Sequence, residues 1–355
     1  MATSAYIHIP FCKSKCKYCS FISYPNIEEK EQYLAVLEKE IRYFYNNEKL
    51  KTLYFGGGTP SVLSIKELEK LLNLFKFDKN TEITLELNPE NITNEYLKNL
   101  KELGINRLSI GCQTFDDEIL KIIGRRHNSK DVKNTVENAQ KAGFKNISLD
   151  FIYGLPNQTI DGFSHDLITA KSLNIQHISL YGLKIDENCY FHRCPPENLP
   201  DDDTQADMYI TAIEALKDFQ HYEISNFGIP SKHNLNYWNN ENYYGFGISA
   251  HGYINDVRYS NFEDFNNYFN NPFKHMTETK LTMTEQLEEE IFLGFRKVDG
   301  INIQNINKKF NIDFEKKYNN IIKKYNDFFI KTSTNYALNS QGILISNTIL
   351  AEFLS

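Results

Sequence analysis

The first half of the chain alternates short runs rich in β-branched residues with longer stretches of helical periodicity. This alternation predicts repeated β-α units and a parallel sheet, because parallel neighbours need a long crossover connection. Six units fit an open, partial (β/α)6 barrel, in which the loops at the carboxyl ends of the strands carry the functional groups. The six expected strands are Ala5–Ile9, Thr52–Phe55, Glu82–Leu87, Arg107–Gly111, Asn146–Phe151 and His177–Tyr181.

Local signals mark where several helices begin and end. Ser64 and Glu67 have the spacing of a capping box, which predicts a helix start at this point. Gly104 and Gly143 follow Leu103 and Ala142 and are expected to end two further helices.

The pattern changes after the sixth strand. We expect a barrel over residues 1–230, a connecting region over 231–281 and a small C-terminal domain over 282–355. The stretch from about Glu187 to Lys280, with a helix at Thr204–Phe219, is expected to be an extension of the barrel that covers its mouth. The last part is expected to form a winged-helix-like domain with a lid or docking role; its helices are predicted at Glu285–Arg296, Ile303–Phe310 and Phe314–Tyr325, and its hairpin strands at Asn335–Leu338 and Gly342–Ser346.

Composition sets limits on the class of protein. A chain of 355 residues with 41% hydrophobic content can bury a sizeable core. The formal net charge of −7 and the lack of a Lys/Arg block argue against nucleic-acid binding. No apolar run reaches the length of a membrane span, and no signal segment precedes the first strand, so we expect a cytoplasmic protein. Peripheral membrane contact is left open.

Three cysteines, Cys12, Cys16 and Cys19, follow the first predicted strand in a C-x3-C-x2-C spacing. Iron–sulfur clusters of the cubane type usually take four thiolates, so a set of three predicts a [4Fe–4S] cluster with one iron open to another ligand. A structural zinc site is the alternative, but it would need a second ligand pair, and the later pair, Cys189 and Cys194, has x4 spacing. Disulfides are less favoured, because few cysteines and no signal segment indicate a reducing compartment.

A family resemblance rests on two segments. The run from Tyr6 through Pro10 to Cys19, and the later Gly56-Gly57-Gly58-Thr59-Pro60-Ser61, resemble the radical S-adenosylmethionine (SAM) superfamily. The similarity spans nearly the whole chain and lies in the branch of oxygen-independent coproporphyrinogen III dehydrogenases and heme chaperones. It implies that SAM chelates the open iron and that the reduced cluster can cleave it to a 5′-deoxyadenosyl radical.

The resemblance also implies a set of SAM-binding residues near the strand ends. For the tyrosines, the alternative is packing that fixes the cysteine loop. Any one of the polar residues could instead be a helix cap or part of a surface ion pair, but four polar residues at successive strand ends favour a binding site. The glycine run lacks the Lys-Ser/Thr ending of a P-loop, so nucleotide triphosphate hydrolysis is not expected. The implied residues are Tyr6, Tyr18, Gly57, Gly58, Thr59, Glu86, Gln113, Arg125 and Asp150.

Two features separate a carrier from an enzyme within this branch. The porphyrinogen-processing enzymes carry a further cysteine two residues past the third, where this chain has Phe21. The run His233-Asn-Leu-Asn-Tyr-Trp238 resembles the H-N-x-x-Y-W motif of the heme chaperones, which implies His233 as a heme ligand. A histidine that merely caps a loop is the alternative, and His251 and His192 are weaker candidates.

Three functions therefore stand as hypotheses. The first is a heme chaperone that binds the cluster, SAM and heme and delivers heme to acceptor proteins, with formation of a homodimer left open. The second is an oxygen-independent coproporphyrinogen III dehydrogenase, which converts propionates to vinyl groups by oxidative decarboxylation. The third is a radical SAM enzyme acting on another tetrapyrrole. The sequence leaves open whether SAM is cleaved.

Overall fold

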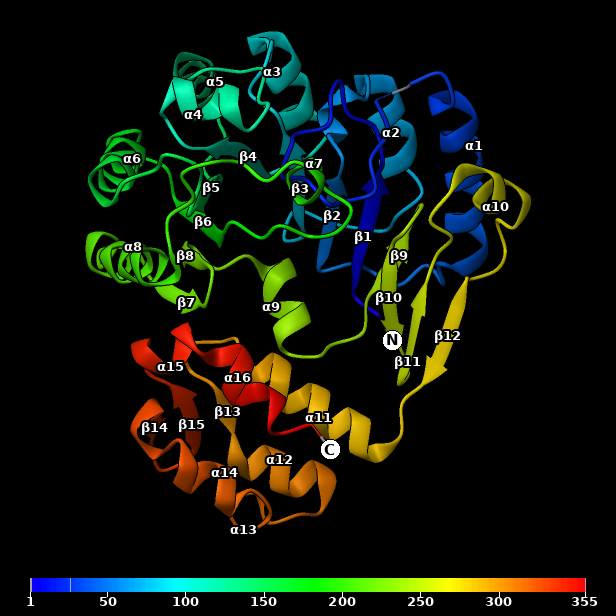
Figure 1. The fold of residues 1–355 in the computed structure, drawn as a ribbon. Coiled ribbons are helices and arrows are strands. Elements are labelled where there is room, and N and C mark those ends of the chain that lie inside the picture. Colours follow the sequence, from blue (N-terminus) through cyan, green and yellow to red (C-terminus); the bar gives the residue numbers. More distant parts are fainter. Residues whose placement is uncertain (1, 26, 355) are drawn as a thin grey trace.

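The structure is a computed structural model that describes residues 2–25 and 27–354. Six parallel strands form the centre of its main sheet, as the sequence predicts, and consecutive strands are neighbours throughout. Helices on the outer side connect them (Figure 1). This is the expected partial (β/α)6 barrel. Its strands are β1 (Ser4–Ile9), β2 (Thr52–Gly57), β3 (Glu82–Leu87), β4 (Arg107–Gln113), β5 (Ile147–Tyr153) and β6 (His177–Gly182).

The connecting helices begin and end at the expected signals. The capping box of Ser64 and Glu67 is formed, and Gly104 follows its helix with φ +93°, a backbone conformation that glycine adopts without strain. The helices are α1 (Lys30–Phe44), α2 (Ile65–Leu72), α3 (Asn94–Glu102), α4 (Asp117–Ile122), α5 (Ser129–Lys141) and α6 (Ile160–Ser172), with a 3-10 turn at Pro60–Val62.

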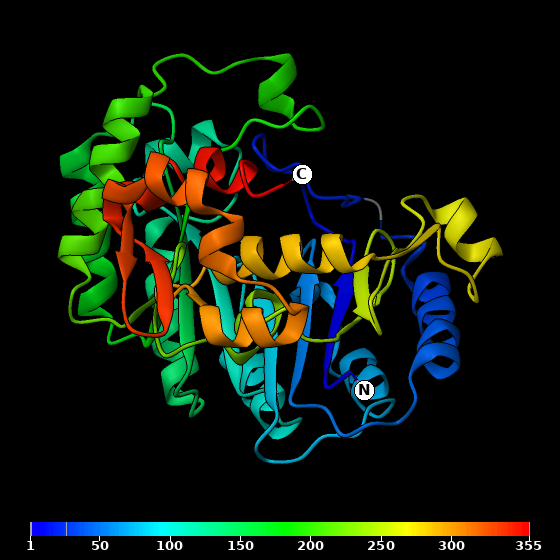
Figure 2. The ribbon, with the colours of Figure 1, turned by 90° about the horizontal axis from the view of Figure 1, so that it is seen from below.

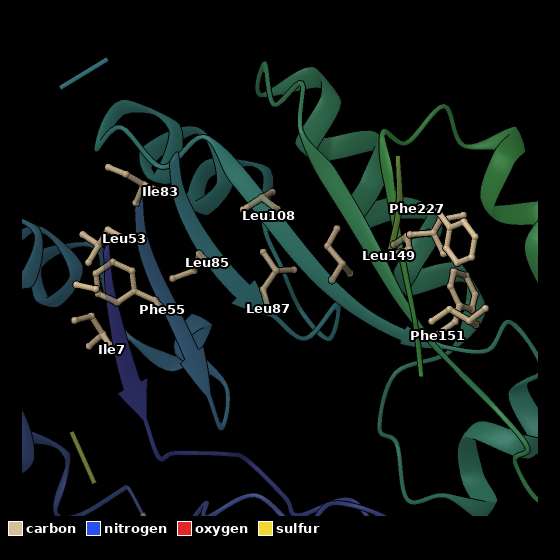
Figure 3. Close-up of a cluster of buried hydrophobic side chains, with 14 of the residues drawn as sticks. Ile7, Leu53, Phe55, Ile83, Leu85, Leu87, Leu108, Leu149, Phe151 and Phe227 are labelled. Atoms are coloured by element: carbon tan, nitrogen blue, oxygen red, sulfur yellow. The ribbon is translucent and has the colours of Figure 1, made fainter. Parts of the chain in front are cut away.

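Side chains alternate between the two faces of the six strands. One face is apolar and packs against the helices; Ile7, Phe55, Leu85, Leu108 and Leu149 are fully buried there (Figure 3). Residues of the opposite alternation are largely polar, and the strand register aligns them across the barrel interior. These inward-facing residues include Thr52, Tyr54, Glu82, Glu86, Arg107, Ser109, Ser148, Asp150, His177 and Ser179.

The region after β6 extends the sheet at both edges, to nine strands in the order β7-β8-β6-β5-β4-β3-β2-β1-β9, which agrees with the expected extension of the barrel. That this region covers the barrel mouth stays a prediction. A separate three-stranded sheet follows. The predicted helix at Thr204–Phe219 is α8, which ends earlier. The elements are α7 (Tyr190–Arg193), α8 (Asp202–Ala215), β7 (His221–Glu223), β8 (Asn226–Gly228), α9 (Lys232–Trp238), β9 (Tyr244–Phe246), β10 (His251–Ile254), β11 (Val257–Ser260), α10 (Phe265–Asn270) and β12 (Thr277–Lys280).

The C-terminal elements pack beside the barrel, and α9 lies between them and the sheet (Figures 1 and 2). One predicted strand is wrong: Gly342–Ser346 belongs to helical structure, because the Asn339 side chain accepts from Gly342 N and starts a helix. The hairpin is formed instead by β14 and β15. The elements are α11 (Met283–Gly294), β13 (Ile301–Asn302), α12 (Ile303–Phe310), α13 (Phe314–Lys317), α14 (Asn319–Lys324), a 3-10 turn at Asn326–Phe328, β14 (Phe329–Lys331), β15 (Asn335–Leu338), α15 (Ser340–Leu344) and α16 (Ser346–Ala351).

Candidate functional site

The loop after β1 brings Cys12, Cys16 and Cys19 to the wall of one cavity of about 560 Å³. Backbone hydrogen bonds hold this loop: Cys12 N donates to Tyr24 O at 3.0 Å, and Cys19 N donates to Cys16 O at 3.2 Å. The cavity lies at the carboxyl ends of the strands, where a β/α barrel is expected to carry its site. The sequence therefore predicted correctly where the three thiols meet.

The thiols are partly buried and have polar neighbours. Cys12 Sγ lies 3.3 Å from Thr59 Oγ1, and Arg125 donates to Cys16 Sγ at 3.5 Å. Burial raises the pKa of Cys19 to about 11. Across residues 2–25 and 27–354, no three His, Cys, Asp or Glu side chains are gathered around the position of a single metal ion.

Gly56 and Gly57 end β2 and Gly58 follows it, and this glycine run packs against β1 and the start of the cysteine loop. A side chain at Gly57, which has φ +110°, would meet the His8 ring at 2.6 Å, and one at Gly58 would meet Phe11 O at 2.8 Å. Its N–H groups are also used within the protein: Gly58 N donates to Ile9 O and Thr59 N to Phe11 O. These two N–H groups are therefore occupied by backbone carbonyl oxygens. The lack of a side chain at these glycines lets the chain pack closely against β1 and the cysteine loop.

Glu86 and Asp150 line the same cavity from β3 and β5. Glu86 accepts from Tyr54 Oη at 2.8 Å and from Gly57 N at 3.2 Å, and Asp150 accepts from the hydroxyls of Ser109 and Ser148. Burial, with Asp150 nearby, raises the pKa of Glu86 to about 7, and burial also raises the pKa of Asp150. A cationic ligand group in the cavity would favour the ionised form of both carboxyls.

Gln113 and Arg125 complete the polar wall. The pairing of β4 with β5 is irregular between Gly111 and Gln113, and Gln113 adopts φ +64°, which is uncommon for a residue with a side chain. Its Oε1 atom is buried and has no hydrogen-bond partner in the described structure. Arg125 bonds Gly111 O at 2.9 Å and also contacts Asn88. The unpaired acceptor on Gln113 points to a ligand that donates a hydrogen bond.

The two tyrosines differ in position. Tyr18 lines the cavity and packs against a small apolar cluster around Ile119 and Ile123, so it also fixes the loop. Tyr6 is not part of the cavity lining; its hydroxyl bonds His8 Nδ1 at 3.0 Å. The geometry therefore gives Tyr6 a packing role beneath the loop, while Tyr18 remains at the cavity.

Several cavity residues were missed by sequence reasoning. Arg107 is 1% exposed on the inner face of β4, lines the cavity and has a buried Nε atom without a partner. Asn88, Ser109 and Tyr181 also line it. A parallel strand that is buried on both faces is usually apolar throughout. These strands instead alternate polar and apolar residues, and this alternation could have indicated from the sequence that the barrel interior is polar.

His233 lies inside the barrel rather than on a surface. It is 1% exposed at the start of α9, and its backbone N–H donates to the inward-facing Glu82. Both ring nitrogens are engaged: Nδ1 lies 2.7 Å from Thr52 Oγ1 and Nε2 lies 2.9 Å from Tyr237 Oη. Burial lowers its pKa to about 3, so the ring is neutral at ordinary pH. Neither nitrogen is free for a metal in this arrangement.

Comparisons with known proteins agree with this fold. Residues 6–167 match the family model of the radical SAM superfamily, and residues 281–328 match that of the HemN C-terminal domain. The solved structure of coproporphyrinogen III oxidase (HemN) from Escherichia coli, described as a radical SAM enzyme, superposes with a TM-score of 0.87 over 100% of this chain and 90% of its own, at 22% identity. The protein is thus a radical SAM protein with a HemN-type C-terminal domain.

Relatives with higher identity narrow the assignment. A heme chaperone HemW of Lactococcus lactis is 38% identical over 99% of this chain and 97% of its own, and that of Bacillus subtilis is 37% identical over 99% of both. The chain belongs to the heme chaperone HemW family. No helix among the described residues has the length and apolarity to cross a membrane.

Proposed function

We propose that this protein is a heme chaperone that holds a [4Fe–4S] cluster, binds SAM and heme, and delivers heme to acceptor proteins. The observation that carries the proposal is the similarity to two HemW heme chaperones across 99% of the chain. This similarity includes the C-terminal region as well as the barrel, so it concerns a whole protein of the same organisation.

The cavity supports binding of the cluster and SAM. Cys12, Cys16 and Cys19 would ligate three irons and leave the fourth for the amino and carboxylate groups of SAM. The unpaired Gln113 Oε1 and the carboxyl of Glu86 supply acceptors for the donors and the positive charge of that ligand. When reduced, such a cluster can supply an electron to SAM and generate a 5′-deoxyadenosyl radical.

The site differs from that of the dehydrogenases where their further cysteine is expected. Phe21 stands in that position, is 67% exposed and lines the cavity beside Cys19. A phenyl group cannot replace a thiol. The similarity to HemN at 22% identity supports a shared fold and does not extend to its reaction.

Heme and its acceptor proteins are the partners in this proposal, and we place the protein in the cytoplasm. All six cysteines are free thiols, which suits a reducing compartment. Ligation of heme by His233, a homodimer and peripheral membrane contact stay predictions.

An anaerobic titration tests the proposal. The protein is reconstituted with iron and sulfide, SAM binding is measured calorimetrically, and hemin is titrated in a parallel sample. Cys16→Ala is expected to lose the iron-dependent absorbance, whereas Cys194→Ala is the matched control, because Cys194 is exposed and outside the cavity lining.

A second arm supplies coproporphyrinogen III, SAM and reductant. Stoichiometric hemin binding without formation of vinyl product supports the chaperone. Vinyl product in the absence of hemin binding would establish the dehydrogenase instead. Zinc in place of iron in the isolated protein would contradict the cluster.

A further inference from the structure

Arg107 is the only lysine or arginine in the barrel strands β1–β6, and it is the first residue of β4. Its side chain belongs to the inward-facing set and is 1% exposed, yet it lines the cavity that holds the three cysteines. Neither the cluster nor the acceptors assigned to SAM account for it. A guanidinium stays protonated at any ordinary pH, so Arg107 places a permanent positive charge inside the barrel.

This charge has no close ionic partner in the described part of the chain. Arg107 Nε is buried and lacks a hydrogen-bond partner, and Arg107 Nη2 lies 3.5 Å from His177 Nδ1. Burial, together with the charge of Arg107, lowers the pKa of His177, so its imidazole is neutral at ordinary pH. A buried cation without compensation is strongly destabilising. The compensating negative charge therefore lies further away than in an ion pair.

Two acidic side chains of the neighbouring strands line the same cavity, Glu86 on β3 and Asp150 on β5. Glu86 is in register with Ser109 of β4, and the Ser109 hydroxyl donates to Asp150 at 2.8 Å. Arg107 is one inward-facing position before Ser109, between the strands that carry the two carboxyls. Burial raises the pKa of each carboxyl, and the charge of Arg107 acts against this rise in both.

We propose that Arg107 is the shared counter-ion of Glu86 and Asp150 and so acts as a positioning residue of the SAM site. This inference rests on the proposed function, in which SAM is the cationic ligand of the cavity. Two carboxyls close together in a buried site do not both ionise easily, and a nearby cation favours the ionised form of each. With Arg107 present, both carboxyls offer charged acceptors to the sulfonium and ammonium groups of SAM. Without it, one carboxyl holds a proton at neutral pH, and SAM binds only as that proton passes to the buffer.

The other groups that face the two carboxyls do not supply this positive charge. Arg125 lines the cavity, but it donates to Gly111 O and Cys16 Sγ. Burial raises the pKa of Cys112 on β4, so it is a neutral thiol near Asp150. Tyrosines approach from β1, β2, β6 and α9, and burial raises the pKa of each, so they are also neutral; they are Tyr6, Tyr54, Tyr181 and Tyr237.

Glu82 is the alternative partner of Arg107. Its charge also acts on Arg107 from β3. However, Glu82 accepts from the backbone N–H groups of Lys232 and His233 at the start of α9, and it does not line the cavity. A role of Arg107 through Glu82 would concern the packing of α9 and not the ligand, so Glu82→Gln separates the two.

The test measures SAM binding to the full-length, reconstituted protein by anaerobic calorimetry from about pH 6 to pH 8.5. Two buffers with different enthalpies of ionisation give the number of protons released on binding. The variants are Arg107→Met, Arg107→Lys and Glu82→Gln, with Arg42→Met on the exposed face of α1 as the control. Titration of SAM itself cancels when the variants are compared with wild type. Circular dichroism and the iron-dependent absorbance establish that each variant is folded and holds its cluster.

We expect the SAM affinity of wild type to rise with pH through about 7, where Glu86 ionises, and then to level off. In Arg107→Met the rise is expected at least about one pH unit higher, with an affinity at pH 7 about ten-fold lower and more protons released. Arg107→Lys keeps the charge and should keep the pH midpoint of wild type. Glu82→Gln and Arg42→Met should leave both the midpoint and the proton release unchanged.

The outcomes separate this inference from the proposed function. An unchanged pH profile in Arg107→Met, or a loss of affinity that is equal at every pH, would overturn the role as counter-ion. If Arg107→Met does not fold, a displaced midpoint in Arg107→Lys would do the same. A displaced midpoint in Glu82→Gln would assign the effect of Arg107 to α9. Failure of wild type to bind SAM at any pH would overturn the proposed function and this inference together.

Discussion

A buried carboxyl in α1 makes a pH-dependent contribution to stability. Glu40 is 2% exposed and accepts from Gly247 N at 2.9 Å, from Asn261 Nδ2 at 2.6 Å and from Tyr268 Oη at 2.5 Å. These bonds tie α1 to the segment that follows β9, the strand next to β1. Burial outweighs the hydrogen bonds and raises the Glu40 pKa from 4.5 to about 7.

The sign and size of the effect follow from this shift. Between pH 4.5 and 7 the folded state binds more protons at Glu40 than the unfolded state, so stability falls as pH rises through this window. At about 1.4 kcal/mol per pKa unit, the loss between pH 5 and pH 8 is about 2 to 3 kcal/mol. Glu40→Gln removes the titration and hence this slope. It is expected to add a pH-independent cost of about 1 to 2 kcal/mol, because the Gln Nε2 cannot accept from all the donors that Glu40 accepts.

The assay is urea unfolding followed by circular dichroism at several pH values from 5 to 8. The quantity of interest is the difference in unfolding free energy between wild type and Glu40→Gln, since other titrating groups cancel in it. Glu31→Gln, an exposed position of the same helix, is the control and is expected to leave the slope unchanged. A difference that stays constant from pH 5 to pH 8 would refute the reasoning.

Three further substitutions and one control, Gly143→Ala, test the packing behind the site. Gly57→Ala is expected to lower the free energy of unfolding by at least about 2 kcal/mol and to lower iron retention, because its Cβ would lie 2.6 Å from His8. Gly143 also has a positive φ, but a Cβ there would have nothing within 4 Å. Gly143→Ala should therefore cost only about 1 kcal/mol in thermal unfolding. Phe55→Ala removes a fully buried ring and should cost about 3–5 kcal/mol in the same assay. Glu82→Gln weakens the acceptor at the start of α9 and should broaden the Trp238 emission on mild heating, while an unaltered spectrum would count against this contact.

The barrel was predictable because its signals are local. Each strand is a short run with its own periodicity, and the capping box and Gly104 mark helix boundaries within a few residues of sequence. The position of the three cysteines on the rim followed from the chain order alone, because the loop after each strand of a parallel barrel lies at the carboxyl-terminal end of the barrel. These features need no knowledge of long-range packing.

Other features depend on partners far away in the sequence. The composition of Gly342–Ser346 predicts a strand, but the Asn339 side chain caps a helix that begins at Ser340. The burial of His233 depends on Thr52, which lies 181 residues earlier. Likewise, β9 joins β1 across most of the chain, so the extension of the sheet at both edges could not be read from local pattern. Contacts between residues far apart in the sequence therefore determine these features more strongly than local secondary-structure propensity or the position of a motif does.

The placement of α9 shows what a motif resemblance leaves undetermined about the surroundings of its residues. The resemblance of His233-Asn-Leu-Asn-Tyr-Trp238 drew attention to the histidine, because imidazole is the better-known iron ligand. The fold turns that imidazole inward, where Thr52 and the Tyr237 hydroxyl contact its two nitrogens, and Tyr237 and Trp238 also line a cavity of about 700 Å³ between α9 and α11. His233 and Tyr237 are four residues apart in α9, so they share a side of the helix and can hydrogen-bond to each other. The other neighbours of the two side chains can still differ. A motif therefore indicates which residues lie together, whereas the neighbours of each side chain depend on the rest of the fold.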